Sequence, residues 1–142
     1  MSHIERVHLK YKPAQIFDLV ADVESYPKFL PWVIDARIFR RRDDTLWVDQ
    51  TVGTRLIRRR FTTVAKLDRP HTIVISSHDP LFERFAQQWR FKPAREGGTD
   101  VEYRIDLQFR SRLLQTLIGA SFAERAKTMT DAFRHRARRL YG

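Results

Sequence analysis

The residue types that usually bind metals are either absent from this chain or wrongly spaced for the task. The histidines are His3, His8, His71, His78 and His135, and none lies in an HExxH, HxH or similar ligand pattern. Cysteine is absent, which excludes disulfides and thiolate ligands. We therefore expect no metal site.

Catalytic motifs are equally hard to find. Gly97 and Gly98 lie in a predicted hairpin and lack both the GKS/T sequence and the following helix of a phosphate-binding loop. No nucleophile elbow occurs. Acidic residues fall almost wholly in turns or on the polar faces of predicted strands, so no desolvated carboxylate pair is expected for acid–base chemistry. The sequence favours a container over a catalyst, and we expect neither enzymatic activity nor a cofactor.

Arginine is the residue type best placed to bind a ligand by charge. The formal net charge is +10, and the arginines gather in residues 40–42, 58–60 and 134–139. Arginine suits phosphate groups, and phosphate neutralisation is independent of sequence. Nucleic acid, the ribosome and anionic lipid are all candidate partners, and a solvated basic surface without a partner is the alternative.

Residues 111–140 are predicted to form one long amphipathic helix. Its apolar stripe recurs at steps of four or three and consists of Leu114, Ile118, Phe122, Ala126, Met129, Phe133, Ala137 and Leu140. Ser111 is a suitable N-cap, and the arginines of the last turns complement the helix dipole. Such a helix is on the order of 45 Å long. It therefore needs a large apolar partner.

The middle of this helix carries unusually small side chains. They are Gly119, Ala120, Ser121 and Ala123. Small residues either let another backbone approach closely or leave empty volume, and both interpretations stay open.

The rest of the chain is predicted to supply the partner. Alternating residues predict a first strand ending near Tyr11, and Pro13 suits the first position of a short helix. Ser25 suits the N-cap of a second short helix that ends before Pro31. Six further runs of period two, joined by short turns, predict an antiparallel sheet. The whole chain, residues 1–142, is expected to form a single α+β domain in which a curved sheet of about seven strands surrounds the final helix.

The inward faces of this sheet are aromatic and aliphatic. The last two strands place Trp89, Phe91, Tyr103, Ile105, Leu107 and Phe109 opposite the helix. Such a surface suits an apolar, ring-bearing ligand, although a fully packed core would have the same composition. The polar groups expected to face inward are Tyr103, Gln87 and Ser121.

One segment resembles a known family. Residues 22–32, with the pattern Tyr-Pro-x-Phe-Leu-Pro-Trp, resemble the coenzyme Q-binding proteins of the START superfamily, which also includes polyketide cyclases. These proteins are similar to the bacterial ribosome-association toxins. The likeness extends to Trp89-Arg90-Phe91 and to the C-terminal residues. The family often has Cys after Pro-Trp, whereas this chain has Val33, so a thiol role is not expected.

The resemblance implies a helix-grip fold, like that of the birch-pollen allergen, around a lipophilic cavity. It implies binding of a polyprenyl quinone such as ubiquinone, delivered or chaperoned in support of respiration and without catalysis. We expect the ring and first isoprene units to lie inside and the rest of the tail outside. The predicted entrance consists of Tyr26, Phe29, Leu30, Pro31 and Trp32. The predicted wall consists of Phe82, Trp89, Leu114, Ile118 and Phe122.

The cellular setting follows from charge and hydropathy. The N-terminal residues lack the apolar region of a secretory signal, and no run approaches a membrane span. A cytoplasmic protein is expected, bound peripherally to the inner face of the cell membrane through Arg134, Arg136, Arg138 and Arg139. The toxin resemblance implies ribosomal RNA as the alternative partner, and DNA is not expected. An aromatase or cyclase of the same fold is a third possibility, which would need polar groups in the cavity.

Overall fold

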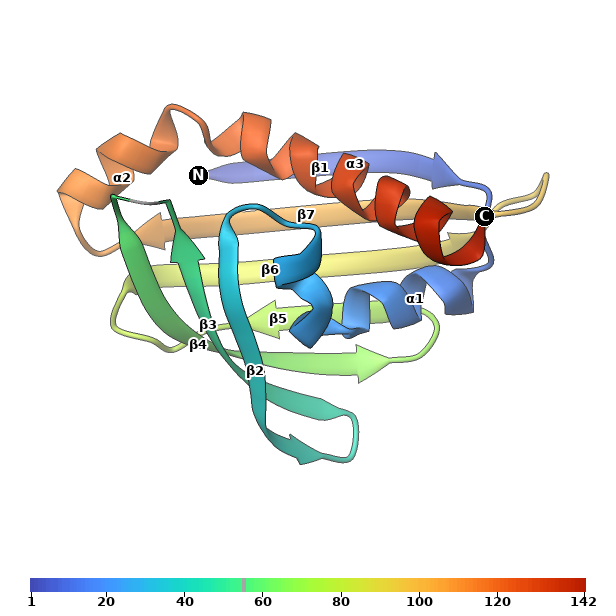
Figure 1. Ribbon diagram of the computed structural model, residues 1–142, viewed down its shortest axis with the longest axis horizontal. Coiled ribbons are helices and arrows are strands. Elements are labelled where there is room, and N and C mark those ends of the chain that lie inside the picture. The colour runs from blue at the N-terminus through green and yellow to red at the C-terminus, as the bar shows by residue number, and fades with distance from the viewer. Residues whose placement is uncertain (55) are drawn as a thin grey trace.

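A computed structural model describes residues 1–54 and 56–142 (Figure 1). Along the chain the elements are β1 (Ser2–Leu9), α1 (Pro13–Ala21), the 3-10 helix η1 (Val23–Lys28), β2 (Val33–Arg42), β3 (Thr45–Gly53), β4 (Arg58–Asp68), β5 (Thr72–Ser76), β6 (Phe82–Pro93), β7 (Thr99–Phe109), α2 (Arg112–Gly119) and α3 (Phe122–Tyr141). The predicted order of one strand, two short helices, six strands and a C-terminal helical segment is confirmed.

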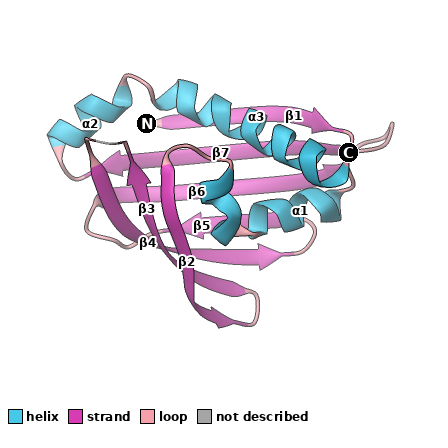
Figure 2. Cartoon of the chain, viewed as in Figure 1, coloured by secondary structure: helices cyan, strands magenta, loops and turns pink. Residues whose placement is uncertain are grey.

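The strands form one antiparallel sheet in the order β1-β7-β6-β5-β4-β3-β2. Short connections make neighbours of consecutive strands from β2 to β7, and β1 completes the sheet by pairing with β7. The sheet curves so that β2, β3 and β4 bend across the end of the longer strands, and the helices cover one face (Figures 1 and 2). The predicted helix-grip class is therefore confirmed.

An aromatic cluster fastens α3 to the sheet and to η1. Phe133 is 1% exposed, and its ring centroid lies 5.2 Å from that of Trp89 and 5.1 Å from that of Phe29. Tyr26 adds a further edge contact to Phe133 at 5.5 Å. These edge-to-face contacts are favourable beyond the area they bury. The C-terminal half of α3 is consequently packed solidly, and any hollow must lie nearer its N-terminus.

The prediction of one continuous helix over residues 111–140 is wrong. Ala120 and Ser121 separate α2 from α3, and Ser121 has φ −114° and ψ 7°, outside the helical region. Glycine and serine have low helix propensity, so interrupting the helix at residues 119–121 costs little free energy. The predicted cap is confirmed, because the Ser111 hydroxyl accepts a hydrogen bond of 3.2 Å from the Leu114 amide.

The last turn of the predicted apolar stripe also differs. Leu140 is 50% exposed, whereas the neighbouring Tyr141 packs its ring 5.8 Å from that of Tyr11. The Tyr141 hydroxyl donates a hydrogen bond to the Gln15 carbonyl at 3.2 Å. Tyr141 therefore packs this end of the helix against the segment after β1 and against α1, whereas Leu140 is half-exposed.

Candidate functional site

A cavity of about 190 Å³ lies between the concave face of the sheet and the junction of α2 with α3. Most of its wall is apolar. The lining residues that contribute aliphatic or aromatic surface include Val23, Leu30, Val48, Phe61, Ala65, Ile75, Phe85, Ile105, Leu107, Phe109, Ile118, Phe122, Ala126 and Met129. The volume is below the roughly 300–1,000 Å³ of pockets that enclose drug-sized ligands. The cavity therefore suits a ring or a short chain and not a whole polyprenyl lipid.

The strands supply this wall through their alternation. In β7, Tyr103, Ile105 and Leu107 face inward, and the residues between them face solvent or lie half-exposed. A strand alternates its side chains between two faces, so each long strand contributes every second residue to the wall. The opposite side comes from one face of α3, which contributes Ala126 and Met129.

The small residues in the middle of the predicted helix do not leave the empty volume that was one interpretation of them, although a cavity lies nearby. Gly119, Ala120, Ser121 and Ala123 do not line the cavity. They lie at the junction of the two helices, and Ala120 and Ala123 face solvent. The hollow instead lies beside Ala126 and Ala65, whose short side chains leave the space unfilled.

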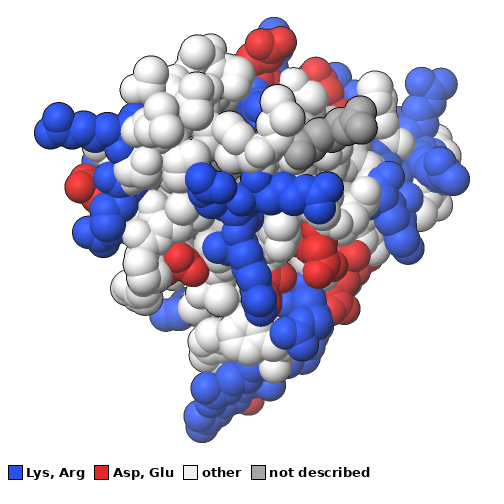
Figure 3. All heavy atoms as spheres, turned by 60° about the vertical axis from the view of Figure 1, so that its left-hand side comes forward, with Lys and Arg blue, Asp and Glu red and all other residues white. Residues whose placement is uncertain are grey.

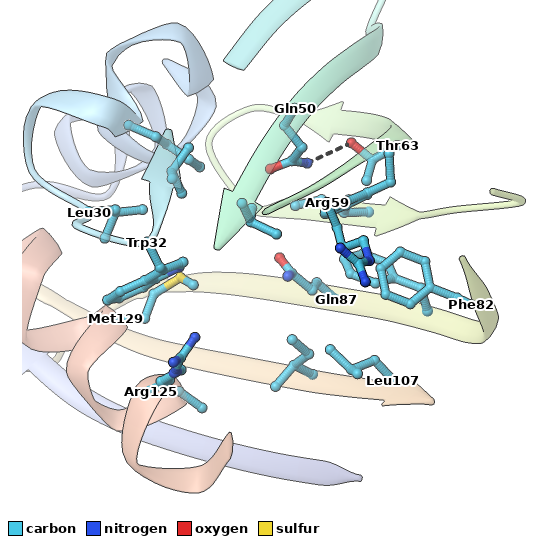
Figure 4. A pocket seen from close by; sticks show the side chains of 18 of the residues that line it. Leu30, Trp32, Gln50, Arg59, Thr63, Phe82, Gln87, Leu107, Arg125 and Met129 are labelled. Atoms are coloured by element: carbon cyan, nitrogen blue, oxygen red, sulfur yellow. Dashed lines mark hydrogen bonds between the residues drawn. The ribbon is translucent and has the colours of Figure 1, made fainter. Parts of the chain in front are cut away.

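A few polar groups are distributed over the wall. The Gln50 amide donates to the Thr63 hydroxyl at 3.3 Å, so these two groups partly satisfy each other (Figure 4). Gln87 projects into the middle of the pocket in the same view. Tyr26 donates its hydroxyl hydrogen to the Val20 carbonyl. Of the polar groups expected from the sequence, Gln87 and Tyr103 line the cavity and Ser121 does not.

Burial keeps both tyrosines of the wall protonated. It raises the pKa of the Tyr103 hydroxyl well above its ordinary value. The pKa of Tyr26 is raised in the same direction, first by burial and then by the neighbouring Tyr103 and Asp22. Both side chains therefore remain neutral hydrogen-bond donors through the physiological pH range.

The mouth of the cavity lies between η1, the β3–β4 turn and the first turn of α3. Trp32, Gly53 and Arg125 line both the cavity and an open depression outside it. Gly53 has φ +140°, and a Cβ there would lie 1.9 Å from the Ile57 carbonyl oxygen, so the turn requires glycine. Arg59 from β4 and Arg125 from α3 reach the pocket from different sides (Figure 4).

Seven of the ten predicted ligand-contacting residues line this cavity. They are Tyr26, Leu30, Trp32, Phe82, Trp89, Ile118 and Phe122. The structure places them together, while their contact with a ligand stays a prediction.

The other three lie elsewhere. Phe29 packs against Phe133 on the solid side of η1. Pro31 lines only the outer depression. Leu114 is buried on α2, the helix that packs against β7, and does not reach the cavity. Phe29 and Pro31 follow η1, and their place in the sequence motif does not determine the direction of their side chains.

Sequence reasoning missed the wall residues of β3 and β4. Val48, Gln50, Thr63 and Ala65 all line the cavity. Their two-residue spacing was a usable signal, but it assigns them to a buried face without separating packed positions from hollow ones.

The arginines of the C-terminal turns do not form one exposed surface. Arg136 is half-buried with its guanidinium 5.4 Å from the centre of the Phe29 ring, a cation–π arrangement. Arg134 pairs with Asp131 at 3.5 Å. Arg138 and Arg139 face solvent. This end of α3 is also the end away from α2 and the β3–β4 turn (Figure 1).

The described residues, 1–54 and 56–142, contain no group of three or more His, Cys, Asp or Glu side chains that could hold a metal ion. None of their helices is long and apolar enough to cross a membrane.

Fold and cavity together define a helix-grip protein with an apolar internal pocket that opens beside the junction of two C-terminal helices. The family model described as polyketide cyclase / dehydrase and lipid transport matches residues 9–134. The chain belongs to this family.

Individual relatives differ in what their names say. The chain is 32% identical over 142 residues to the ribosome association toxin RatA of Pseudomonas aeruginosa, with 99% of each chain covered. It is 27% identical over 138 residues to the mitochondrial coenzyme Q-binding protein COQ10 homolog B of Xenopus laevis, covering 94% of this chain and 57% of that one. The solution structure of an 18 kDa protein from Caulobacter crescentus is 33% identical, with 100% and 99% of the chains covered and a TM-score of 0.80.

Proposed function

We propose that this protein binds a polyprenyl quinone of the ubiquinone type, with the ring in the cavity, and delivers or chaperones it in support of respiration. The observation that carries the proposal is the apolar cavity of about 190 Å³ and its open mouth. A quinone ring fits in a cavity of this volume, whereas a long isoprenoid tail must leave through the mouth. The relative named for coenzyme Q binding supports the choice of ligand.

A binding role without catalysis is supported by the chemistry of the wall. Among the described residues, the cavity lining contains no Asp, Glu or His, and its charged members are Arg59 and Arg125. Acid–base catalysis requires a group that can give or take a proton near neutral pH, and an arginine side chain stays charged there. Burial raises the pKa of Tyr26 and Tyr103, the remaining titratable groups of the described wall, so neither is suited to exchange a proton near neutral pH.

Mass spectrometry of an organic extract from protein purified from its own host tests this proposal. A quinone in the extract supports it, and a lipid of another class contradicts it. Phe122→Arg should abolish retention, because Phe122 is 9% exposed and lines the cavity, where an added charge would have no partner. Phe39→Arg is the matched control, since Phe39 is 47% exposed on β2 and the same charge there should leave retention unchanged. Circular dichroism must confirm that both variants fold.

Delivery requires contact with a membrane, and the end of the molecule that carries the mouth suits an anionic bilayer. Leu56 is 94% exposed at the β3–β4 turn, and Leu113 and Leu117 are 69% and 51% exposed on α2. The chain has no acidic residue between Asp49 and Asp68, nor between Asp106 and Glu124. In the view of Figure 3, which brings this end forward, Lys and Arg side chains lie around and across uncharged surface.

Exposed leucines among arginines fit lipid better than they fit RNA. Arginine binds phosphate groups in either partner. An exposed leucine contributes binding free energy only where it can enter an apolar phase. We accordingly propose that the membrane-facing surface consists of Leu56, Leu113 and Leu117 with the exposed Arg58 and Arg112, instead of the C-terminal turns.

Ribosome binding is the second candidate function, because relatives at 30–32% identity are named ribosome association toxins and align over nearly the whole chain. Sucrose-gradient centrifugation of ribosomes with the purified protein tests it. Co-migration with a subunit and a loss of 70S particles would favour this function. Unchanged profiles at physiological salt, where binding through phosphate alone is weakened, would exclude it.

A further inference from the structure

The hydroxyl of Tyr103 is an unusual group in the cavity wall. Tyr103 is 0% exposed, and its hydroxyl oxygen has no hydrogen-bond partner among the residues that the structure describes. A buried polar group without a partner destabilises a fold, so most such groups are paired. Tyr26, the other tyrosine of the wall, follows this rule by donating to the Val20 carbonyl.

The position of Tyr103 explains why the fold itself offers no partner. It lies in β7 directly opposite Trp89 of β6, and the two ring centroids are 4.4 Å apart. A strand side chain stands roughly perpendicular to its sheet, so the hydroxyl is the part of Tyr103 farthest from the backbone groups of β7. The surrounding wall is almost entirely aromatic and aliphatic.

Gln87 is the nearest side-chain amide on the same face of the sheet. It pairs in register with Ile105, two residues along β7 from Tyr103. Diagonal neighbours of this kind lie about 7–8 Å apart. Gln87 is half-buried, and both Gln87 and Tyr103 line the cavity, so the two donor-bearing side chains belong to one wall.

We propose that Tyr103 and Gln87 form a donor pair that hydrogen-bonds the carbonyl oxygens of a ring ligand in the cavity. The inference rests on the proposed function, since it names the groups by which the same cavity recognises a quinone ring. A carbonyl oxygen only accepts hydrogen bonds, and a neutral tyrosine hydroxyl and an amide NH₂ can both donate. The charged members of the wall, Arg59 and Arg125, lie on other elements, β4 and α3.

The unpaired donor makes the site selective for rings that carry a hydrogen-bond acceptor. An apolar ring of the same shape leaves the Tyr103 hydroxyl without a partner, whereas a carbonyl-bearing ring satisfies it. Sites built to hydrogen-bond a ligand discriminate strongly against analogues that lack the matching group. The cavity should therefore prefer a quinone to the corresponding hydrocarbon.

The test compares duroquinone, a tetramethylbenzoquinone, with durene, the tetramethylbenzene of the same outline. Quenching of tryptophan fluorescence reports duroquinone binding, because Trp32 and Trp89 line the cavity. The binding of durene is measured by its competition with duroquinone. The wild-type protein should bind duroquinone about a hundredfold more tightly than durene, about tenfold for each of the two neutral hydrogen bonds.

Tyr103→Phe should reduce that preference about tenfold. The variant should lose about tenfold in duroquinone affinity and bind durene unchanged, as expected for one neutral hydrogen bond. Its thermal midpoint without ligand should equal or exceed that of the wild type, because the substitution removes an unpaired buried hydroxyl. Gln87→Leu should reduce the preference in the same direction. Tyr141→Phe is the control: the Tyr141 hydroxyl donates to the Gln15 carbonyl and Tyr141 does not line the cavity, so this variant should keep the preference.

The outcomes separate the inference from the function on which it rests. Equal duroquinone affinity in the wild type and Tyr103→Phe overturns the donor pair and leaves the proposed function standing. Durene bound as tightly as duroquinone by the wild type also overturns the pair. Failure of the wild type to bind duroquinone at all overturns both.

Discussion

At the scale of single residues, two alanines of α3 show how position decides between a hollow and a packed interior. Ala126 is 5% exposed and lines the cavity, whereas Ala137 is 0% exposed in the solid C-terminal half of the helix. Both belong to the apolar stripe that faces the sheet. Both alanines are buried on the same helix, and they differ in whether the cavity or packed side chains lie beside them.

Ala126→Leu should fill part of the cavity. We expect the free energy of unfolding to rise by about 1–2 kcal/mol, because the added carbons are buried without displacing neighbours. Quinone affinity should fall at least about tenfold, since a lost ring contact of about 1.4 kcal/mol corresponds to that factor. Urea denaturation and fluorescence titration measure the two effects.

Ala137→Leu is the matched control on the same helix face. Added carbons in a packed region force neighbouring side chains apart, so this variant should lose about 1–3 kcal/mol of stability. Its ligand affinity, measured under conditions where it is folded, should match the wild type. If Ala126→Leu is destabilised as much as Ala137→Leu, the cavity is not available space.

At the scale of elements, α2 is the piece of the structure least tied to the rest. It packs against β7 and α3, and Leu114 is its one fully buried residue. The break at Ala120 and Ser121 separates it from the firmly packed α3. The result is a short amphipathic helix beside the cavity mouth with two leucines facing solvent.

The double substitution Leu113→Gln with Leu117→Gln should weaken binding to vesicles that contain anionic lipid. Each exposed leucine contributes about 1.5 kcal/mol or more if it becomes buried in lipid, so the pair should cost at least about tenfold in partition coefficient. Cosedimentation with liposomes at low and at physiological salt measures it. Glutamine leaves the net charge unchanged, which confines the effect to the apolar contact.

Two controls locate the membrane-facing surface. Leu140→Gln removes a leucine that is 50% exposed on the last turn of α3 and should leave vesicle binding intact. Arg138→Gln with Arg139→Gln should produce only the modest loss expected for reduced net charge. If the C-terminal variants lose binding and the α2 variant keeps it, the membrane contacts the C-terminal turns.

At the scale of the whole molecule, arginine–carboxylate pairs tie neighbouring strands together across the outer face of the sheet. Asp49 of β3 accepts a hydrogen bond of 2.8 Å from Nε of Arg60 on β4 and lies 3.7 Å from Arg37 of β2. Hydrogen bonding from Arg60 is the main reason that the pKa of Asp49 is held below its ordinary value. The pKa values of Asp18, Glu102 and Asp106 are lowered in the same way by arginine partners.

These lowered pKa values predict acid sensitivity. A carboxyl group whose pKa is lower in the folded than in the unfolded protein stabilises the fold above the unfolded value, near 4. That contribution is lost as pH falls through the lower, folded value. The free energy of unfolding from urea titrations should therefore decline below about pH 4. Asp49→Asn should make the decline shallower, whereas Asp43→Asn, in the exposed β2–β3 turn, should leave it unchanged.

The local patterns determined the elements and their class. Strand alternation, the cap at Ser111 and the turn residues between runs are local properties of neighbouring residues, and the structure confirms the order of the elements, the antiparallel sheet and the helix-grip class. The arginine content and the lack of cysteine are likewise properties of composition. Seven of the ten predicted site residues line the cavity: Phe82, Trp89, Ile118 and Phe122 were predicted from strand or helix phase, and Tyr26, Leu30 and Trp32 from the family resemblance.

Tertiary structure alone decided where the space is and what faces it. The break between α2 and α3, the hollow beside Ala126, the packing of Phe29 against Phe133 and the position of Pro31 in the outer depression depend on contacts between elements far apart in the sequence. Periodicity predicts which face of its strand or helix a side chain lies on. It does not predict whether the side chains of the facing element fill the space between them. For the same reason, no local pattern distinguishes the unpaired hydroxyl of Tyr103 from the bonded hydroxyl of Tyr26.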